Sequence, residues 1–436
     1  MWYQTGVFYQ IYPLGFCGAS PVNNGQQTHG IKKVEQWIGH MQNLGATAVL
    51  LNPLFESDAH GYDTRDFTKV DGRLGTNQDF AEVCGALHAA GMRVVLDGVF
   101  NHVGRGFWAF QDVQQKRENS LYKDWFYIDF NGNSNYNDGF WYEGWEGHFE
   151  LVKLNLQYLP VVEYLLHCVE GWIREFDIDG LRLDVAYCLD TGFLRRLRHF
   201  TDEKKRDFFL VGEMLHGDYK NIVGTGLLHS ATNYECYKGL YSSLNTSNFF
   251  EIAYSLNRQF GPEPWTLYKE LPLFNFADNH DVTRAASIIN DKGLLPLLYG
   301  MLFGMPGIPC LYYGSEWGAE GVREEGSDAQ LRPCFDAPQE HELFACIQTM
   351  CRVRTQAPAL QYGGYRQAYL TNHQFIFERA YQGQRILVAL NAAGEEHAAH
   401  FNAEAGRAVD LLTGRPVDFG GGLRLPPRSV LFLKTE

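Results

Sequence analysis

Short apolar runs alternate with amphipathic segments along the first 355 residues. Eight runs have the length and composition of β-strands, at 6–12, 47–53, 92–100, 180–185, 208–214, 232–237, 272–278 and 308–314. Between most of them, apolar residues recur at intervals of three and four, as on one face of an α-helix. Eight strand–helix units in succession predict α/β architecture, a parallel sheet closed into a (β/α)8 TIM barrel. A doubly wound open sheet is the alternative, but no Gly-x-Gly-x-x-Gly follows the first strand.

Two parts of the chain depart from this alternation. The connection between His102 and Gly180 is much longer than the others, even after a helical pattern at 160–176 is allowed for. Because long connections in compact domains are usually functional, we predict an inserted small lobe at 103–155, after strand 3 of a barrel at 1–355. Beyond Pro358, short alternating runs are separated by Gly- and Pro-rich turns. This pattern predicts a C-terminal antiparallel β-sandwich domain at 356–436.

Charge and composition narrow the classes of partner. The formal net charge of −14 argues against a nucleic acid or an anionic membrane, which bind basic patches. No run of 18 apolar residues is present, and the N-terminus lacks the features of a signal peptide. The nine cysteines are scattered without a Cys-x-x-Cys pair. We therefore expect reduced cysteines and a cytoplasmic protein.

Polar residues stand where several of the predicted strands end. In the stretch DGLRLDVAYCLD, Arg182 and Asp184 share one face of a strand whose other face is apolar. An isolated pair of this kind is often a structural ion pair. However, Glu213 ends the fifth predicted strand, and His280 and Asp281 end the seventh. The carboxyl ends of barrel strands meet at one mouth, so these side chains are expected to form a single site.

The chemistry open to such a site is narrow. It offers Asp184, Glu213 and Asp281, without a nucleophile elbow, a phosphate loop or a His-Glu-x-x-His motif. Two carboxyl groups suffice for glycoside cleavage, in which one attacks the anomeric carbon and the other protonates the leaving oxygen. An arginine beside the nucleophile favours its charged form. We therefore predict that Arg182 keeps Asp184 ionised.

The motifs that contain these residues resemble those of the α-amylase family of retaining α-glucoside-acting enzymes. They occur in the family's order: HGYDTRDF (60–67), LDGVFNH (96–102), GLRLDVA (180–186), VGEM (211–214), FADNHD (276–281) and GIPCLYYGSEWG (307–318). The resemblance implies that Asp184 is the nucleophile, Glu213 the general acid/base, and Asp281 the third carboxylate, which holds sugar hydroxyls.

The resemblance also implies the residues that bind substrate. Tyr62 matches the platform that stacks under the sugar, with Asp63 as its structural neighbour. His102, Arg182 and His280 match residues that position the nucleophile or the same sugar ring. In SDAQLRP (327–333), Asp328 and Arg332 are spaced like the family's Asp-Pro-x-x-Arg pair, with Ala329 in place of the proline.

Within the family, LVKLNL (151–156) is most similar to the motif of the neopullulanase, maltogenic amylase and cyclomaltodextrinase branch. That branch carries an N-terminal β-domain, which we expect to be absent because the first strand begins near Gly6. Its calcium loop is also expected to be lost, because CGASPVNNGQQ contains no acidic residue. Asn101 matches a calcium ligand of many amylases, but a lone Asn is more often a turn residue. We expect no metal ligand and no required cofactor, and structural calcium is not favoured.

Three functions are compatible with these motifs. The first is a retaining hydrolase of maltooligosaccharides or cyclodextrins that cleaves α-1,4 bonds, with α-1,6 bonds as further candidates. The second is a transglycosylase or isomerase, which uses the same three carboxylates but delivers a sugar hydroxyl instead of water. The third is an inactive carbohydrate-binding barrel, which the presence of all three carboxylates disfavours. The sequence leaves the oligomeric state open.

Overall fold

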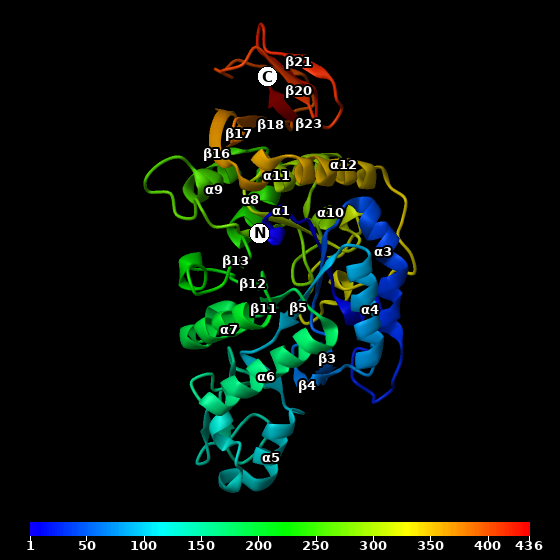
Figure 1. The fold of residues 1–436 in the computed structure, drawn as a ribbon, viewed down its shortest axis with the longest axis vertical. Coiled ribbons are helices and arrows are strands. Elements are labelled where there is room, and N and C mark those ends of the chain that lie inside the picture. The colour runs from blue at the N-terminus through cyan, green and yellow to red at the C-terminus, as the bar shows by residue number, and fades with distance from the viewer.

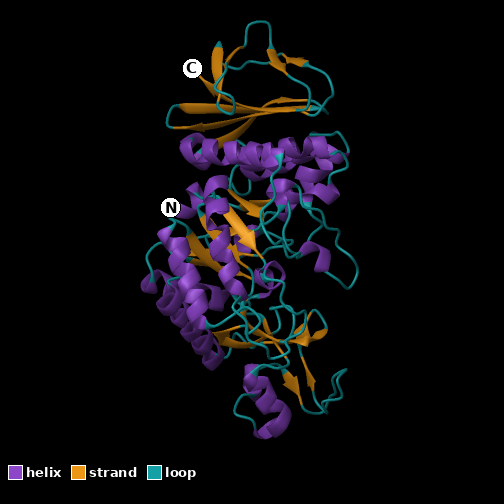
Figure 2. Ribbon diagram, turned by 90° about the vertical axis from the view of Figure 1, so that its right-hand side faces the viewer, coloured by secondary structure: helices purple, strands orange, loops and turns teal.

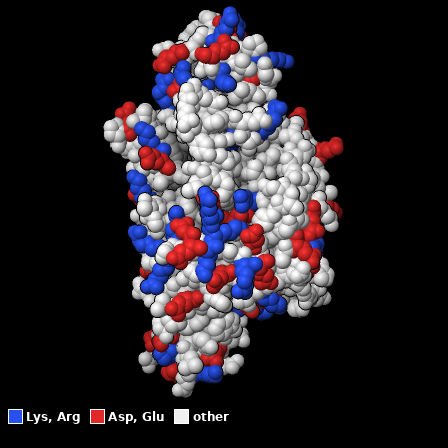
Figure 3. Space-filling view, in the orientation of Figure 1, with Lys and Arg blue, Asp and Glu red and all other residues white.

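The computed structural model describes residues 1–436 and has three parts arranged along its long axis (Figures 1 and 2). A central barrel lies between a small lobe at one end and a sheet that contains the C-terminus at the other. No helix combines the length and the apolar composition that crossing a bilayer requires. On the face shown in Figure 3, basic and acidic side chains are intermingled.

The barrel consists of eight parallel strands and confirms the predicted fold class. In spatial order they are β13 (Ser230–Ala231), β12 (Phe209–Gly212), β11 (Gly180–Leu183), β5 (Arg93–Gly98), β2 (Ala48–Leu51), β1 (Phe8–Ile11), β15 (Ile308–Tyr312) and β14 (Phe274–Phe276). A parallel bridge between Thr232 and Phe274 joins the first of these to the last and closes the ring. Inward-facing side chains such as Phe8, Val95 and Phe209 fill its interior.

The sixth predicted strand, 232–237, is wrong. The strand at this place is the two-residue β13, and the aromatic stretch that follows it begins a helix, α8 (Tyr234–Asn245). The side chain of Asn233 caps this helix by accepting a hydrogen bond of 3.2 Å from the backbone N–H of Cys236. The cap satisfies an N–H that has no partner within the helix, so the chain turns helical directly after Asn233.

Helices cover the outside of the barrel. The longer ones are α3 (Lys33–Leu44), α4 (Asn77–Ala89), α6 (Leu159–Phe176), α7 (Thr191–Lys204), α8, α9 (Phe250–Phe260), α11 (Leu295–Gly304) and α12 (Glu342–Gln356). Short helices are α1 (Trp2–Thr5), α2 (Pro13–Phe16), α10 (Ala285–Ile288) and α13 (Pro358–Tyr362). Helix α4 begins with a reciprocal capping box between Thr76 and Asp79 and ends just before Gly91, whose φ is 80°.

The inserted lobe follows β5 and lies at the end of the molecule farthest from the C-terminal sheet (Figure 1). It contains β6 (His102–Gly104), α5 (Trp108–Lys116), β7 (Ile128–Asp129), β8 (Trp141–Tyr142), β9 (Gly144–Trp145) and β10 (His148–Lys153). Strand β10 pairs with both β6 and β9. Nearby, β3 (Phe55–Ser57) and β4 (Thr64–Val70) form a hairpin. The lobe therefore connects directly to the strand end that carries His102.

The C-terminal domain is an antiparallel sheet of six strands. In spatial order they are β16 (Gly364–Leu370), β17 (Gln374–Tyr381), β18 (Gln384–Asn391), β23 (Ser429–Thr435), β20 (Arg407–Asp410) and β21 (Pro416–Asp418). The pair β19 (His397–Ala399) and β22 (Leu423–Leu425) packs over one face through Leu387 and Leu425. The sheet also packs on α11, where Arg379 donates a hydrogen bond of 2.7 Å to the carbonyl oxygen of Gly304.

Candidate active site

A cleft of about 840 Å³ opens at the carboxyl ends of the barrel strands. The catalytic and substrate-binding residues inferred from the sequence that line it are Tyr62, His102, Asp184, Glu213, Asp281, Asp328 and Arg332. Arg182 and His280 lie buried directly beneath them, in contact with Asp184 and Asp281. The fold thus brings every site residue inferred from the sequence into one place.

The guanidinium of Arg182 contacts three carboxylates. Its Nη1 donates hydrogen bonds to both oxygens of Asp97, at 2.8 and 2.6 Å, and lies 3.2 Å from Oδ1 of Asp184. Its Nη2 lies 2.9 Å from Oε1 of Glu213. One cation therefore links the predicted nucleophile to the predicted acid/base, while Asp97 holds that cation in the floor of the site.

Burial sets the proton affinity of the two catalytic carboxyls. Loss of solvation raises the pKa of Asp184 well above its ordinary value, the charge of Glu213 adds to this, and the charge of Arg182 opposes it. Burial likewise raises the pKa of Glu213 against the opposing charge of Arg182. The charge of Arg182 thus opposes the effect of burial on the pKa of Asp184 without outweighing it, and the prediction that Arg182 keeps Asp184 ionised is not confirmed. Two neighbouring acids of this kind hold one proton between them more tightly than isolated acids do, as general acid catalysis requires.

The backbone beside the nucleophile is strained. Val185 has a φ of 38°, a left-handed conformation that is rare for a β-branched residue. In this conformation its N–H donates a hydrogen bond of 2.9 Å to Oε2 of Glu213. The strain is therefore coupled to the placement of the acid/base.

Asp281 lies against a histidine and an arginine. Its Oδ2 lies 2.9 Å from Nε2 of His280, and its Oδ1 accepts a hydrogen bond of 2.9 Å from Nη2 of Arg332. The same Nη2 lies 2.9 Å from Asp328. Burial would raise the pKa of Asp281, but His280 and Arg332 hold it well below its usual range. Asp281 is thus an anion, suited to accept hydrogen bonds from sugar hydroxyls.

His280 is fixed from several sides. Its ring stacks with those of Tyr12 and Tyr62, at centroid distances of 5.9 and 5.7 Å. Gln10 Nε2 lies 3.0 Å from its Nδ1, and Asn52 Nδ2 lies 3.4 Å from its Nε2. The hydroxyl of Tyr62 also contacts His280 and donates a hydrogen bond of 3.1 Å to Asp97. These contacts hold the imidazole against Asp281.

His102 presents an unused nitrogen to the cleft. Burial lowers its pKa to about 3, so the imidazole is neutral at physiological pH. Its Nδ1 lies 3.1 Å from the side-chain amide of Asn101, and its Nε2 lies 3.8 Å from Oδ2 of Asp184 without a hydrogen-bond partner. A buried nitrogen of this kind gains a partner when a hydroxylated ligand enters the cleft.

The lobe contributes one aromatic side chain to the cleft. Trp145 lines it, next to His102. The other aromatic side chains of the lobe could equally have been sugar platforms, but Trp108, Trp125, Tyr136, Phe140, Trp141 and Tyr142 do not line it. Most of them pack on one another or on Arg105 as the lobe's own core.

Several residues of the site were not assigned a role from the sequence. Gln10 and Asn52 orient His280, Tyr12 stacks with it, and Asp97 anchors Arg182. The sequence does single out Gln10, because it is an amide within the otherwise apolar run at 6–12. In the structure its side chain is buried, at 4% exposure. No group of three His, Cys, Asp or Glu side chains has an arrangement suited to a metal ion.

A parallel barrel with paired buried carboxyls, a partner arginine and a third acid at its mouth defines a glycoside hydrolase. The family model described as "Alpha amylase, catalytic domain" matches residues 10–341, and the chain belongs to the α-amylase family.

Individual relatives agree with this assignment. A cyclomaltodextrinase from Bacillus sp is 30% identical, over 95% of this chain and 75% of that protein. An intracellular maltogenic amylase from Bacillus subtilis is 28% identical, over 99% of this chain and 76% of that protein. Among solved structures, the Nostoc punctiforme debranching enzyme superimposes with a TM-score of 0.83 at 27% identity, covering 100% of this chain and 99% of that one.

Proposed function

We propose that the protein hydrolyses α-1,4 bonds of maltooligosaccharides and cyclodextrins, with retention of configuration at the anomeric carbon. The contact of one guanidinium, that of Arg182, with both Asp184 and Glu213 carries the proposal. It ties together the two carboxyls that a retaining mechanism needs close to each other. The names of the similar cyclomaltodextrinase and maltogenic amylase support this substrate class.

The proposed reaction has two displacements. Asp184 attacks the anomeric carbon, the glycosidic bond breaks, and Glu213 donates its proton to the departing oxygen. The resulting glucosyl ester on Asp184 is hydrolysed by a water molecule, whose proton passes to the Glu213 carboxylate. Asp281 and the neutral His102 bind hydroxyls of the same ring, and these contacts strengthen as the ring distorts.

The proposal also covers a second type of glycosidic bond. The debranching enzyme of similar structure suggests that α-1,6 bonds belong among the substrates to be tried. The reaction is proposed to need no metal ion, because the protein itself supplies the cation beside the nucleophile. Asn23, in the loop where the branch would bind calcium, donates hydrogen bonds to Glu56 and to the carbonyl oxygen of Ser57 instead.

We also propose that the enzyme acts in the cytoplasm. All nine cysteines are free, and most are buried or half-buried. The similar intracellular maltogenic amylase supports the same compartment.

Product analysis tests the proposed activity. The protein is incubated with maltotriose, β-cyclodextrin, pullulan, sucrose and trehalose, with the Glu213→Gln variant as the inactive control. Maltose and glucose from maltotriose are expected, with products no longer than the substrate. Products longer than the substrate would identify a transglycosylase, and interconversion of disaccharides an isomerase. Binding of maltotriose without any product would identify a carbohydrate-binding barrel.

A further inference from the structure

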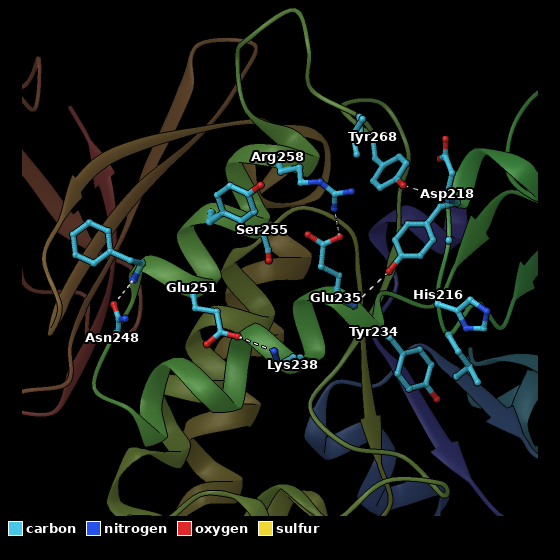
Figure 4. Close-up of a pocket in the computed structure, with 16 residues that line it drawn as sticks. His216, Asp218, Tyr234, Glu235, Lys238, Asn248, Glu251, Ser255, Arg258 and Tyr268 are labelled. Atoms are coloured by element: carbon cyan, nitrogen blue, oxygen red, sulfur yellow. Dashed lines mark hydrogen bonds and ion pairs between the residues drawn. The ribbon is translucent and has the colours of Figure 1, made fainter.

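A second cavity, of about 960 Å³, adjoins the catalytic cleft. It lies among the loop after β12, the helices α8 and α9, and the segment that follows α9 (Figure 4). Leu215 and Tyr234 line both cavities. Leu215 directly follows the Glu213-Met214 pair and is 41% exposed. A ligand chain that leaves the catalytic cleft past Leu215 therefore reaches this second cavity, which we term the side pocket.

The side pocket exposes aromatic rings to solvent. Tyr254 is 68% exposed and Phe250 is 49% exposed, both on α9. Tyr219 and Tyr268 also line the pocket and stack with a centroid distance of 4.9 Å. Exposed aromatic faces clustered in one concavity indicate a ligand that has flat apolar surfaces of its own, as sugar rings have.

The charges of the side pocket are largely paired within it. Arg258 donates a hydrogen bond of 2.5 Å to Glu235, and Lys238 lies 3.5 Å from Glu251 (Figure 4). The charges of these four residues cancel, and Asp218 leaves the lining with one excess negative charge. Neither cation is free for an anionic ligand. Paired ions still offer oxygen acceptors and N–H donors at their edges, which suit a neutral ligand rich in hydroxyls.

We propose that the side pocket is an accessory binding site for the part of an α-glucan chain that extends past Leu215 from the catalytic cleft. This inference rests on the proposed function, since both cavities receive the same chain. Tyr254 and Phe250 stack on sugar rings, while the edges of the Glu235–Arg258 and Lys238–Glu251 pairs bind hydroxyls. The site adds affinity for long substrates without taking part in bond cleavage.

Chain-length kinetics test the side pocket. Wild type, Tyr254→Ala and Phe250→Ala are compared on p-nitrophenyl α-glucoside, maltotriose and maltoheptaose. Each variant is expected to raise KM for maltoheptaose about three- to tenfold, the loss of one aromatic stacking contact. KM for the two short substrates and kcat for all three should stay unchanged. Tyr254→Trp, which keeps an aromatic face, should retain the wild-type KM.

A matched control is Trp265→Ala. Trp265 is 60% exposed on the neighbouring segment but does not line the side pocket, so its removal should leave KM for maltoheptaose unchanged. An unchanged KM for maltoheptaose in both pocket variants, at wild-type thermal stability, overturns the proposal that the side pocket binds substrate. Equal increases for maltotriose and maltoheptaose also overturn it. Failure of the wild type to cleave maltotriose would instead contradict the proposed function. The wild-type measurement alone decides that point, so the two failures can be told apart.

Discussion

Val185 donates its backbone N–H to Oε2 of Glu213 over 2.9 Å, from a left-handed conformation with φ of 38°. Val185→Gly removes a buried side chain, which lowers the free energy of unfolding, but it also removes the strain, because glycine adopts this conformation freely. Its net loss of stability should therefore be smaller than that of the same change at an unstrained buried valine. The matched control is Val211→Gly, a buried valine in the strand β12. By urea unfolding, Val185→Gly should cost about 1–3 kcal/mol less than the control. Its kcat should still fall about tenfold, because the donor is no longer held rigidly. Equal losses of stability would show that Val185 is not strained.

The roles of the two carboxyls are separable with substrates of different leaving groups. Asp184→Asn and Glu213→Gln should each lower kcat on maltotriose by about 10²–10⁴ or more, with unchanged melting temperatures. An aryl glucoside with a very good leaving group needs no proton, so it should partly restore the activity of Glu213→Gln but not of Asp184→Asn. Near-wild-type turnover of maltotriose by Glu213→Gln would contradict the assignment.

Stereochemistry gives a second test of the same pair. A retaining enzyme needs the two carboxyl groups about 5–5.5 Å apart, which is the separation we predict for Asp184 and Glu213. Proton NMR during cleavage of an α-linked substrate should therefore detect the α-anomer first. Initial release of the β-anomer would rule out the double displacement.

His102 links stability to pH. Burial lowers its folded-state pKa to about 3, whereas in the unfolded chain it titrates near 6.5. Between these values the unfolded chain binds more protons, so the free energy of unfolding falls as pH drops from about 6.5 toward 3. His102→Gln should reduce the loss of stability between pH 7 and pH 5, measured by urea unfolding. The exposed His373, changed to Gln, is the control and should keep the full loss. The same loss in both variants would mean that His102 is not the group responsible.

Trp145 should matter most among the lobe aromatics for oligomer binding. It is the one that lines the cleft, whereas Trp141, at 40% exposure, does not. Trp145→Ala should raise KM for maltotriose to maltohexaose by about fivefold, and less for an aryl glucoside. Trp141→Ala should leave both values unchanged. If the two variants behave alike, the lobe influences binding only through its own stability.

Removal of divalent ions should have little effect. Treatment with a chelator is expected to leave activity and melting temperature nearly unchanged, because the loop after β1 offers amides and no carboxylate. A loss of stability that calcium reverses would reveal a site, and Asn101 would be the first residue to change.

The positions of the catalytic carboxyls could be predicted because each directly follows an apolar strand. Asp184 and Glu213 are charged residues at the ends of short buried runs, and in a barrel such ends converge. Tyr62 and Arg332 lie in irregular segments, where periodicity carries no information, and only the family motifs pointed to them. Gln10 and Asn52 act through contacts with His280, about 270 and 228 residues away along the chain, which no local pattern encodes.

The misplaced sixth strand and the roles of the lobe tryptophans both depend on packing that the sequence does not encode locally. The sixth strand was misplaced because Thr and Tyr favour strands, whereas the cap at Asn233 and the packing of α8 decide the outcome. In the lobe, a tryptophan that packs against its neighbours and one that faces a ligand have the same sequence context. Only the folded arrangement separates Trp145, which lines the cleft, from Trp125, which packs inside the lobe at 7% exposure.

The closure of the barrel at Thr232 and Phe274 depends more on side chains than on a backbone ladder. Beyond this single bridge, the buried amide of Asn233 donates hydrogen bonds of 2.9 and 3.0 Å to Gln259 and Asn275. Backbone amides in this seam should therefore exchange with solvent deuterium sooner than those between β1 and β2, since local opening needs fewer bonds to break. The seam adjoins α8 and the loops of the side pocket, so an edge of the barrel that opens readily borders the surface where long substrates would arrive.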